Sequence, residues 1–326
     1  MKRRQAILAI LASTLALVHS PLSRAQSGAK GPVIGLLDVG ERLEWWNAFR
    51  QQMRELGYVE GRNVTFEARY AKGRIEALPA LAKELVQLNV AVIVAGGGSA
   101  AVAAQRVTRK TPIVIASGAG QVSLGLAASL SRPGGNVTGL SSLNSDLMGK
   151  RVDLLREVVP KVSRLGALWH ADNSPSSASV KDLEGSAARS RLGFQSFGIR
   201  SAEELTEAFA AMTRDRVDAL VVVNSGLLYG ERRNIADLAS KHKLPAMYGT
   251  AEYVEAGGLL SYATSYPDLY RRAAIYVDRI LKGANPGDMP IEQPTTFELV
   301  INAKAARALG LAIPPSILAG ADPVIE

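Results

Sequence analysis

The sequence contains no cysteine and only three histidines among its 326 residues. The absence of cysteine excludes disulfides, thiol catalysis and a lipid anchor on an N-terminal cysteine. Beyond Lys2, Arg3 and Arg4 the sequence has no run of three like charges, since 38 Lys and Arg residues are scattered among 30 Asp and Glu residues and leave a formal net charge of +8. Such a mildly basic, mixed surface differs from a nucleic-acid footprint, so we expect no nucleic-acid partner.

Acidic residues are missing altogether between Leu85 and Ser145. Within this stretch Gly96, Gly98 and Ala101 match the dinucleotide fingerprint G-x-G-x-x-G/A. That fingerprint requires a carboxylate for the ribose about 20 residues further on, and it follows the first strand of its fold. Here the glycines follow the third predicted strand and no carboxylate follows them. A G-K-[ST] phosphate loop is absent as well, so the sequence argues against a nucleotide cofactor, and we expect no cofactor or metal.

The N-terminus has the features of a secretory signal. Lys2, Arg3 and Arg4 precede an apolar run over 6–18, and Ser23-Arg24-Ala25 places small residues at positions −3 and −1. The run is shorter than the ~20 residues that a membrane-spanning helix needs. We therefore expect a signal peptide over 1–25, cleavage after Ala25, and a protein that is free in an extracytoplasmic space, most simply a periplasm.

Beyond this segment, short β-branched runs alternate with amphipathic stretches, which predicts βαβ units around parallel sheets. The predicted strands of the first half are 33–38, 64–70, 91–95, 112–116 and 136–140, and those of the second half are 164–170, 194–199, 218–223, 244–248 and 258–263. The predicted helices are 44–56, 76–88, 99–107, 122–130, 176–192, 202–213, 231–242 and 268–282. The stretch 294–310 adds a late strand, a short helix and a glycine stop, followed by a tail.

This recurrence predicts two similar α/β lobes. We assign 31–141 and about 266–292 to lobe 1, and 142–263 and about 295–326 to lobe 2. The chain then passes between lobes near Leu140–Leu143, Tyr262–Tyr266 and Gln293–Thr296. Several crossings make a hinge, and a hinge allows closure on a ligand.

The predicted strands end in small and polar residues, and open parallel sheets bind ligands beyond those ends. These loops are Asp38-Val39-Gly40, Gly96-Gly97-Gly98-Ser99, Ser117-Gly118-Ala119-Gly120, Asp172-Asn173-Ser174, Asn224-Ser225-Gly226 and Tyr248-Gly249-Thr250. Short turns need such residues in any case, but their recurrence at six ends favours a lined cleft. Ser99 either caps the following helix or offers a hydroxyl, and the helix start attracts a carboxylate.

Two histidines and two tryptophans leave alternatives open. His242 fits a packed position beside Ile235 and Leu238, whereas His170 ends a predicted strand and makes an extracytoplasmic hydrolase the alternative enzyme hypothesis. No G-x-S-x-G elbow accompanies it, so we expect no enzyme. Of Trp45 and Trp46, periodicity cannot say which packs in the core and which stacks over a ligand.

Four stretches resemble a known family. They are "ELGYVEGRNV" (55–64), "SLSRPGGNVTGL" (129–140), "YVEAGGLLSYA" (253–263) and the segment 271–326 that begins "RRAAIYVDRILKGANPGDMP". Together they resemble the ABC-transporter substrate-binding proteins of the tryptophan/tyrosine-type group. The resemblance implies a type I periplasmic binding protein fold: two Rossmann-like lobes with parallel sheets, joined by a three-crossing hinge. It also implies a small-molecule ligand in the cleft and delivery to an ABC permease with its ATPase subunit. We expect a monomer.

From the loops and the resemblance together we expect a ligand site for an amino acid or a related carboxylate-bearing solute. Its predicted residues are Asp38, Trp45, Gly97, Gly98, Ser99, Ser117, Gly118, Ala119, Asn173, Asn224, Ser225, Tyr248 and Gly249. The sequence departs from many relatives at Gly120-Gln121, where they carry Asp-Pro, and at Asn224, where they carry Asp. An ammonium group needs a carboxylate partner, which Asp38, Asp172 or Glu252 would have to supply. A neutral or purely anionic solute, and a ligand-sensing input protein for a membrane receptor, remain alternatives.

Overall fold

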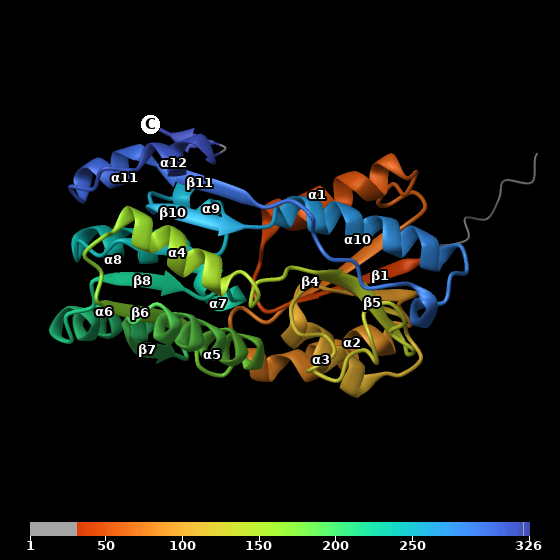
Figure 1. Ribbon diagram of the computed structural model, residues 1–326. Helices are drawn as coiled ribbons and strands as arrows, with labels where there is room; N and C mark the ends of the chain where they lie inside the picture. Colours follow the sequence, from red (N-terminus) through yellow and green to blue (C-terminus); the bar gives the residue numbers. More distant parts are fainter. Residues whose placement is uncertain (1–30, 322) are drawn as a thin grey trace, which may run out of the picture. The chain divides into compact units, whose positions relative to one another are not determined.

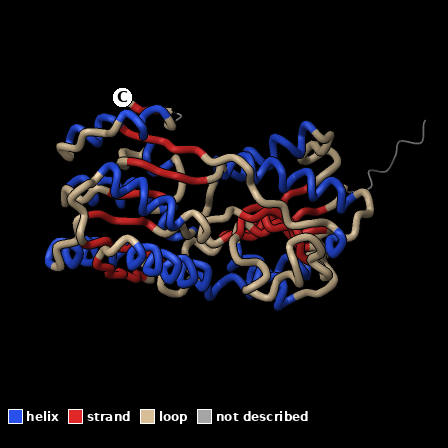
Figure 2. The backbone as a smooth tube through the Cα atoms, viewed as in Figure 1, coloured by secondary structure: helices blue, strands red, loops and turns tan. Residues whose placement is uncertain are grey.

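The computed structural model describes residues 31–321 and 323–326, which form one compact unit. The predicted signal peptide over 1–25 lies outside these residues. None of the helices in the described ranges is both long and apolar enough to cross a membrane. The strands form two separate sheets, each flanked by helices (Figures 1 and 2).

The first sheet has five parallel strands in the order β2-β1-β3-β4-β5. Their bounds are β1 Val33–Asp38, β2 Thr65–Tyr70, β3 Val92–Ala95, β4 Ile113–Gly118 and β5 Val137–Ser141. β3, β4 and β5 are buried along their whole length, as expected for parallel strands covered by helices on both faces. All five predicted strands of the first half are confirmed.

Helices cover both faces of this sheet (Figure 1). α1 (Leu43–Glu55) packs beside α10 (Tyr266–Leu281) on one face, while α2 (Leu78–Gln87) and α3 (Gly98–Val107) pack together on the other. α10 comes from late in the chain, yet it lies against β3, β4 and β5. The carboxyl ends of β1, β3 and β4 therefore lie at one edge, and α3 begins there.

The second sheet has seven strands in the order β12-β11-β10-β9-β8-β6-β7. Their bounds are β6 Arg164–His170, β7 Gly193–Ile199, β8 Ala219–Val222, β9 Ala246–Tyr248, β10 Leu260–Ala263, β11 Glu298–Asn302 and β12 Val324–Ile325. All pairs are parallel except β10 with β11. The five strands predicted for the second half and the late strand are confirmed, whereas the predicted tail in fact ends as β12 on this sheet.

The helices of the second lobe lie on both faces of the second sheet. α4 (Met148–Val158) and α5 (Ser174–Arg189) pack together on one face, and α6 (Leu205–Arg214) and α8 (Arg232–Lys241) pack together on the other. The short helices are α7 Gly226–Gly230, α9 Glu252–Glu255, α11 Ala303–Ala308 and α12 Pro315–Ala319, with 3-10 turns η1 Ile75–Ala77, η2 Ala202–Glu204 and η3 Pro286–Asp288. The chain passes from one sheet to the other at 142–147, 264–265 and 293–297.

One predicted helix is wrong, and the long helix α4 and the short helices α7, α9 and α12 were not predicted. The stretch 122–130 forms turns, because Gly125 has a φ of +70° and the amide of Leu126 bonds to the Gln121 carbonyl instead of continuing a helical ladder. α4 was missed because its start, "DLMGK", offers no capping side chain and contains a glycine.

Gly139 in β5 is required by the close approach of β4. Its φ is +131°, and a Cβ at this position would overlap the backbone nitrogen and carbonyl oxygen of Ile115. The register of the β4–β5 pair shifts just beyond this contact, between Ile115 and Gly118.

We therefore expect Gly139→Ala to lower the free energy of unfolding by about 3 kcal/mol or more, since it adds both strain and overlap. Gly135→Ala is the matched control, because a Cβ there meets nothing within 4 Å. Urea unfolding of both variants measures the difference, and equal stabilities would contradict this account of the β4–β5 contact.

Candidate functional site

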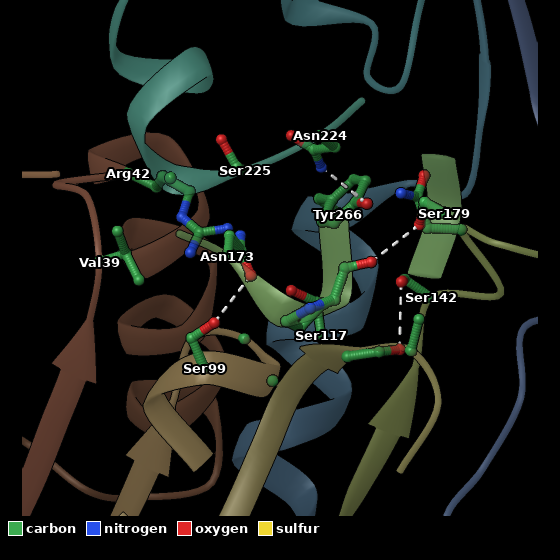
Figure 3. A pocket seen from close by; sticks show the side chains of 17 residues that line it. Val39, Arg42, Ser99, Ser117, Ser142, Asn173, Ser179, Asn224, Ser225 and Tyr266 are labelled. Carbon is green, nitrogen blue, oxygen red and sulfur yellow. Dashed lines mark hydrogen bonds between the residues drawn. The ribbon is translucent and has the colours of Figure 1, made fainter. Parts of the chain in front are cut away.

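A cavity of about 70 Å³ lies between the two lobes, at the carboxyl ends of their strands. First-lobe residues from the loops after β1, β3 and β4 form one side, and second-lobe residues after β6 and β8 form the other. Asn224 and Ser225 face Ser99 and Ser117 across it (Figure 3). Three helices begin at its wall, α3 at Gly98, α5 next to Asn173 and α10 at Tyr266.

The loop after β3 brings main-chain amides to the cavity. A Cβ at Gly96 would overlap the carboxylate of Asp38, so only glycine fits there. Gly97 precedes α3 in an extended conformation and has no capping side chain. Ser99 lies inside the helix and donates from Oγ to Oδ1 of Asn173 at 2.9 Å, which rules out the N-cap role and leaves the hydroxyl role of the two alternatives.

Asp38 and Arg42 form a buried ion pair behind the first-lobe side. The guanidinium donates to both carboxylate oxygens of Asp38, and the Tyr270 hydroxyl lies 3.3 Å from Oδ2 and donates to the Gly96 carbonyl at 3.0 Å. Burial opposes the charged form of Arg42, but Asp38, with smaller contributions from Tyr270 and Tyr266, outweighs this opposition and raises the pKa of Arg42. Arg42 lines the cavity, whereas Asp38 does not.

Two second-lobe residues lie at helix starts, and a third, Asn224, keeps an unsatisfied oxygen. Asn173 is the N-cap residue of α5, and the Ser225 hydroxyl accepts the amide of Leu228 at the start of α7. Asn224 donates from Nδ2 to the hydroxyl of Tyr266 at 2.8 Å. Its Oδ1 is buried and has no hydrogen-bond partner among the described residues.

A buried arginine stands behind the second-lobe wall. Arg151 of α4 is 1% exposed, and its hydrogen bonds to oxygen go to Tyr262 O at 2.8 Å, Asn144 Oδ1 at 2.8 Å and Asn144 O at 3.5 Å. Within the described ranges no carboxylate forms an ion pair with it. Burial lowers the pKa of Arg151 to about 10, so the group stays charged at neutral pH.

Trp45 is fully buried in an aromatic cluster beside the cavity. Its ring stacks on Tyr266 at 4.4 Å and lies 4.5 Å from Tyr229, and its Nε1 donates to Glu252. Tyr229 in turn donates to Glu44 at 2.6 Å. Since Tyr229 and Glu252 belong to the second lobe, this cluster joins α1 to the opposite lobe.

The lobes also meet through main chain. A Cβ on Gly40 would lie 2.7 Å from the carbonyl oxygen of Gly226, and a Cβ on Gly226 would lie 2.7 Å from Cβ of Val39. The loops after β1 and β8 therefore approach as closely as two glycines permit.

The structure brings nine of the thirteen predicted site residues together on the cavity wall. They are Gly97, Gly98, Ser99, Ser117, Gly118, Ala119, Asn173, Asn224 and Ser225. Four are placed elsewhere. Asp38 and Trp45 lie behind the wall as described, Tyr248 is fully buried and stacks on Tyr253 at 4.7 Å, and Gly249 packs behind Asn224.

Sequence reasoning missed eight further wall residues, which are Val39, Arg42, Ser142, Asn144, Pro175, Ser179, Gly226 and Tyr266. Val39 and Gly226 stood in loops that the strand-end rule had already selected. Ser142, Asn144 and Tyr266 lie at or beside the predicted crossings, so extending the rule from strand ends to crossings would have found them. Nothing in the spacing of Arg42 distinguishes it from a surface arginine.

The three carboxylates considered as partners for an ammonium group all have other partners. Asp38 pairs with Arg42, Glu252 accepts from Trp45, and Asp172 pairs with Arg200 at 3.3 Å on the surface. None of them lines the cavity. Arg42 is thus the one charged residue on its wall in the described part of the chain.

Neither His170 nor His242 lines the cavity. His170 is buried at the end of β6, and its Nδ1 has no hydrogen-bond partner among the described residues. His242 packs against Phe209 and bonds to Thr213 Oγ1 at 2.8 Å. No cluster of three or more His, Asp or Glu suited to a metal ion occurs within 31–321 or 323–326.

Comparisons with known proteins agree with this arrangement. Residues 33–325 match the family model described as ABC transporter substrate binding protein. A tyrosine-binding protein of Clostridioides difficile is 25% identical over 263 residues, which are 81% of this chain and 75% of that protein.

Solved structures show the same fold. An ABC domain from Streptococcus pneumoniae in complex with L-Trp superposes with a TM-score of 0.84 at 27% identity, covering 91% of this chain and 100% of that one. A leucine binding protein, LivK, from Thermotoga maritima gives a TM-score of 0.59 at 12% identity over 79% and 84% of the two chains. The type I periplasmic binding fold predicted from the sequence is confirmed.

Burial lowers the pKa of His170, while the carboxylates of Asp172, Glu76 and Glu204 act in the opposite direction without cancelling it. The unfolded chain then binds a proton more readily than the folded one, so stability is lost as the pH falls through the ordinary histidine value near about 6.5.

We expect His170→Gln to reduce the loss of unfolding free energy between about pH 7.5 and about pH 5.5 relative to the wild type. Urea unfolding at both pH values measures this loss. A wild-type loss that survives in His170→Gln would show that other groups cause it.

Proposed function

Since the chain belongs to the family of ABC transporter substrate binding proteins, we propose that it captures a small carboxylate-bearing solute, an amino acid or a related compound, between its lobes. On this proposal the protein is exported before it meets its solute. It binds the solute outside the cytoplasm and delivers it to an ABC permease driven by an ATPase subunit. It makes and breaks no covalent bond. The observation that carries this proposal is the cavity at the strand ends of both lobes.

The carboxylate is assigned to the first-lobe side. The free amides at the start of α3 and the positive end of its dipole favour an anion, and Arg42 lies on the same wall. The Ser99 hydroxyl lies on the same wall but donates its one proton to Asn173, so it can donate to the carboxylate only in exchange for that bond. Relatives named for tyrosine and found with L-Trp support a solute of the amino-acid class.

The volume of the cavity bears on the size of the solute. At about 70 Å³ it is smaller than the roughly 150 Å³ that hold benzene in a protein core. An aromatic amino acid therefore requires the lobes to stand further apart than they do here, whereas an aliphatic one needs less opening. Movement at the three crossings supplies such opening.

We expect Ser99→Trp to abolish binding without unfolding the protein, because an indole at this position fills the cavity. Ser131→Trp, at an exposed position in the same lobe, is the control. Calorimetry with L-amino acids, their 2-hydroxy-acid counterparts and their carboxamides, supported by native mass spectrometry of freshly purified protein, measures binding, and thermal melting checks the fold.

In that panel at least one carboxylate binds the wild type, and its carboxamide binds at least about tenfold more weakly because the helix-end amides lose their anion. A carboxamide that binds as tightly as its parent acid, or unchanged affinity in Ser99→Trp, would remove the assignment.

Gly226→Ala tests closure. The added methyl group meets Val39 and Gly40 of the other lobe, so we expect the dissociation constant of the tightest panel compound to rise by about tenfold or more. Gly230→Ala lies in the same helix and meets nothing within 4 Å, so it keeps the wild-type constant. Equal dissociation constants in the two variants would show that solute affinity does not depend on this contact between the lobes.

A further inference from the structure

The charges around the cavity do not balance. Arg42 is compensated by Asp38, but Arg151 is buried behind Asn144 and pairs with no carboxylate in the described ranges. No Asp or Glu lines the cavity. Arg42, Asp38 and Arg151 are the described charged residues that line the cavity or bond by side chain to a residue that does, and they sum to one positive charge. The starts of α3, α5 and α10 add their partial positive ends.

Arg151 is close enough to the wall to act on its contents. It donates to Oδ1 of Asn144, which lines the cavity. A Cβ on Gly249 would lie 3.6 Å from Nη2 of Arg151 and 3.1 Å from Cβ of Asn224, so Gly249 lies next to both side chains. A buried charge without a counter-ion is costly, and an anion in the cavity would supply the counter-ion that the chain lacks.

The unpaired side-chain oxygen on the second-lobe wall belongs to a neutral amide. Asn224 Oδ1 is buried without a partner among the described residues, so the bound solute is expected to donate a hydrogen bond to it. An ammonium group would meet this amide oxygen and serine hydroxyls but no carboxylate. A hydroxyl or amide donor makes the same bond without bringing a second charge out of water.

We propose that the cavity selects a solute of net negative charge, a carboxylate whose other polar group is a neutral hydrogen-bond donor, over the zwitterion of the same shape. Arg151 is a positioning residue that sets this preference through Asn144, and Asn224 receives the neutral donor. The inference rests on the proposed function and narrows its class of solute.

The test compares pairs of compounds that differ only in this group. L-Lactate and L-alanine form one pair, and 4-hydroxyphenyl-L-lactate and L-tyrosine form another. In calorimetry the hydroxy acid is expected to bind at least about tenfold more tightly than its amino acid. If the amino acid of a pair binds as tightly or more tightly, the inference is overturned while the proposed function stands.

Substitutions of Asn224 and Arg151 test the roles of these two residues. The quantity measured is the ratio of the affinities for the hydroxy acid and its amino acid, and a residue with a purely structural role would leave this ratio unchanged. Asn224→Asp places a carboxylate at the acceptor and is expected to reverse the preference. Asn234→Asp makes the same change of net charge at an exposed position of α8 and leaves the preference as it is. A preference that is the same in both variants would overturn the role of Asn224.

Arg151→Met is expected to remove the preference for the hydroxy acid, and Arg151→Lys to retain it. Should Arg151→Met fail to fold, the comparison of wild type with Asn224→Asp decides. Should none of the four compounds bind, the molecule released from freshly purified protein decides by its mass and composition. An acid without a basic nitrogen supports the inference, an amino acid overturns it, and a molecule without a carboxylate ends the proposed function as well.

Discussion

The buried ion pair between Asp38 and Arg42 determines the first-lobe half of the cavity. Asp38 ends β1 and its carboxylate occupies the space above Gly96, so the loop after β3 must be glycine at that position. The same carboxylate is contacted by Tyr270, which ties α10 to the loop although α10 follows the second crossing of the chain. Because the Asp38 carboxylate neutralises Arg42, the guanidinium can line a buried cavity without leaving an unpaired charge. One local pair, four residues apart, thus links the strand, the glycine loop and a helix from late in the chain.

The two lobes contribute different chemistry to one space. The first lobe offers main-chain amides at the start of α3, whose direction is fixed by the strand that precedes it. The second lobe offers side chains, among them Asn173, whose Oδ1 accepts a hydrogen bond from Ser99, and Asn224, which donates to Tyr266. An anionic group on one side and a neutral donor on the other satisfy both halves. The fully buried aromatic cluster around Trp45 lies outside this space and contributes to contact between the lobes, since its indole reaches Glu252 of the opposite lobe.

Much of the fold could be predicted because parallel strands buried on both faces leave an unmistakable pattern of β-branched runs. The strand ends then located nine wall residues, since backbone direction alone carries those loops to one edge. Side-chain partners could not be predicted from the same pattern. Asp38 was predicted to bind an ammonium group, but it forms an ion pair with an arginine four residues away. Trp45 was predicted to contact the ligand, but its ring stacks on Tyr266. The turns at 122–130 were predicted as a helix because the spacing of apolar residues does not reveal that a glycine has a positive φ.

The contact between Gly40 and Gly226 has a bearing on how the protein measures the size of its guest. Side chains can rotate away when two surfaces press together, but peptide groups cannot, so this contact is a mechanical stop. For a ligand smaller than the space that remains when these two loops touch, the lobes cannot move closer to improve its packing. A larger one holds the two loops apart and forfeits the packing of Tyr229 on Trp45. Discrimination by bulk would then come from a fixed end point of the main chain, and residues that never touch the guest would decide which guests are retained longest.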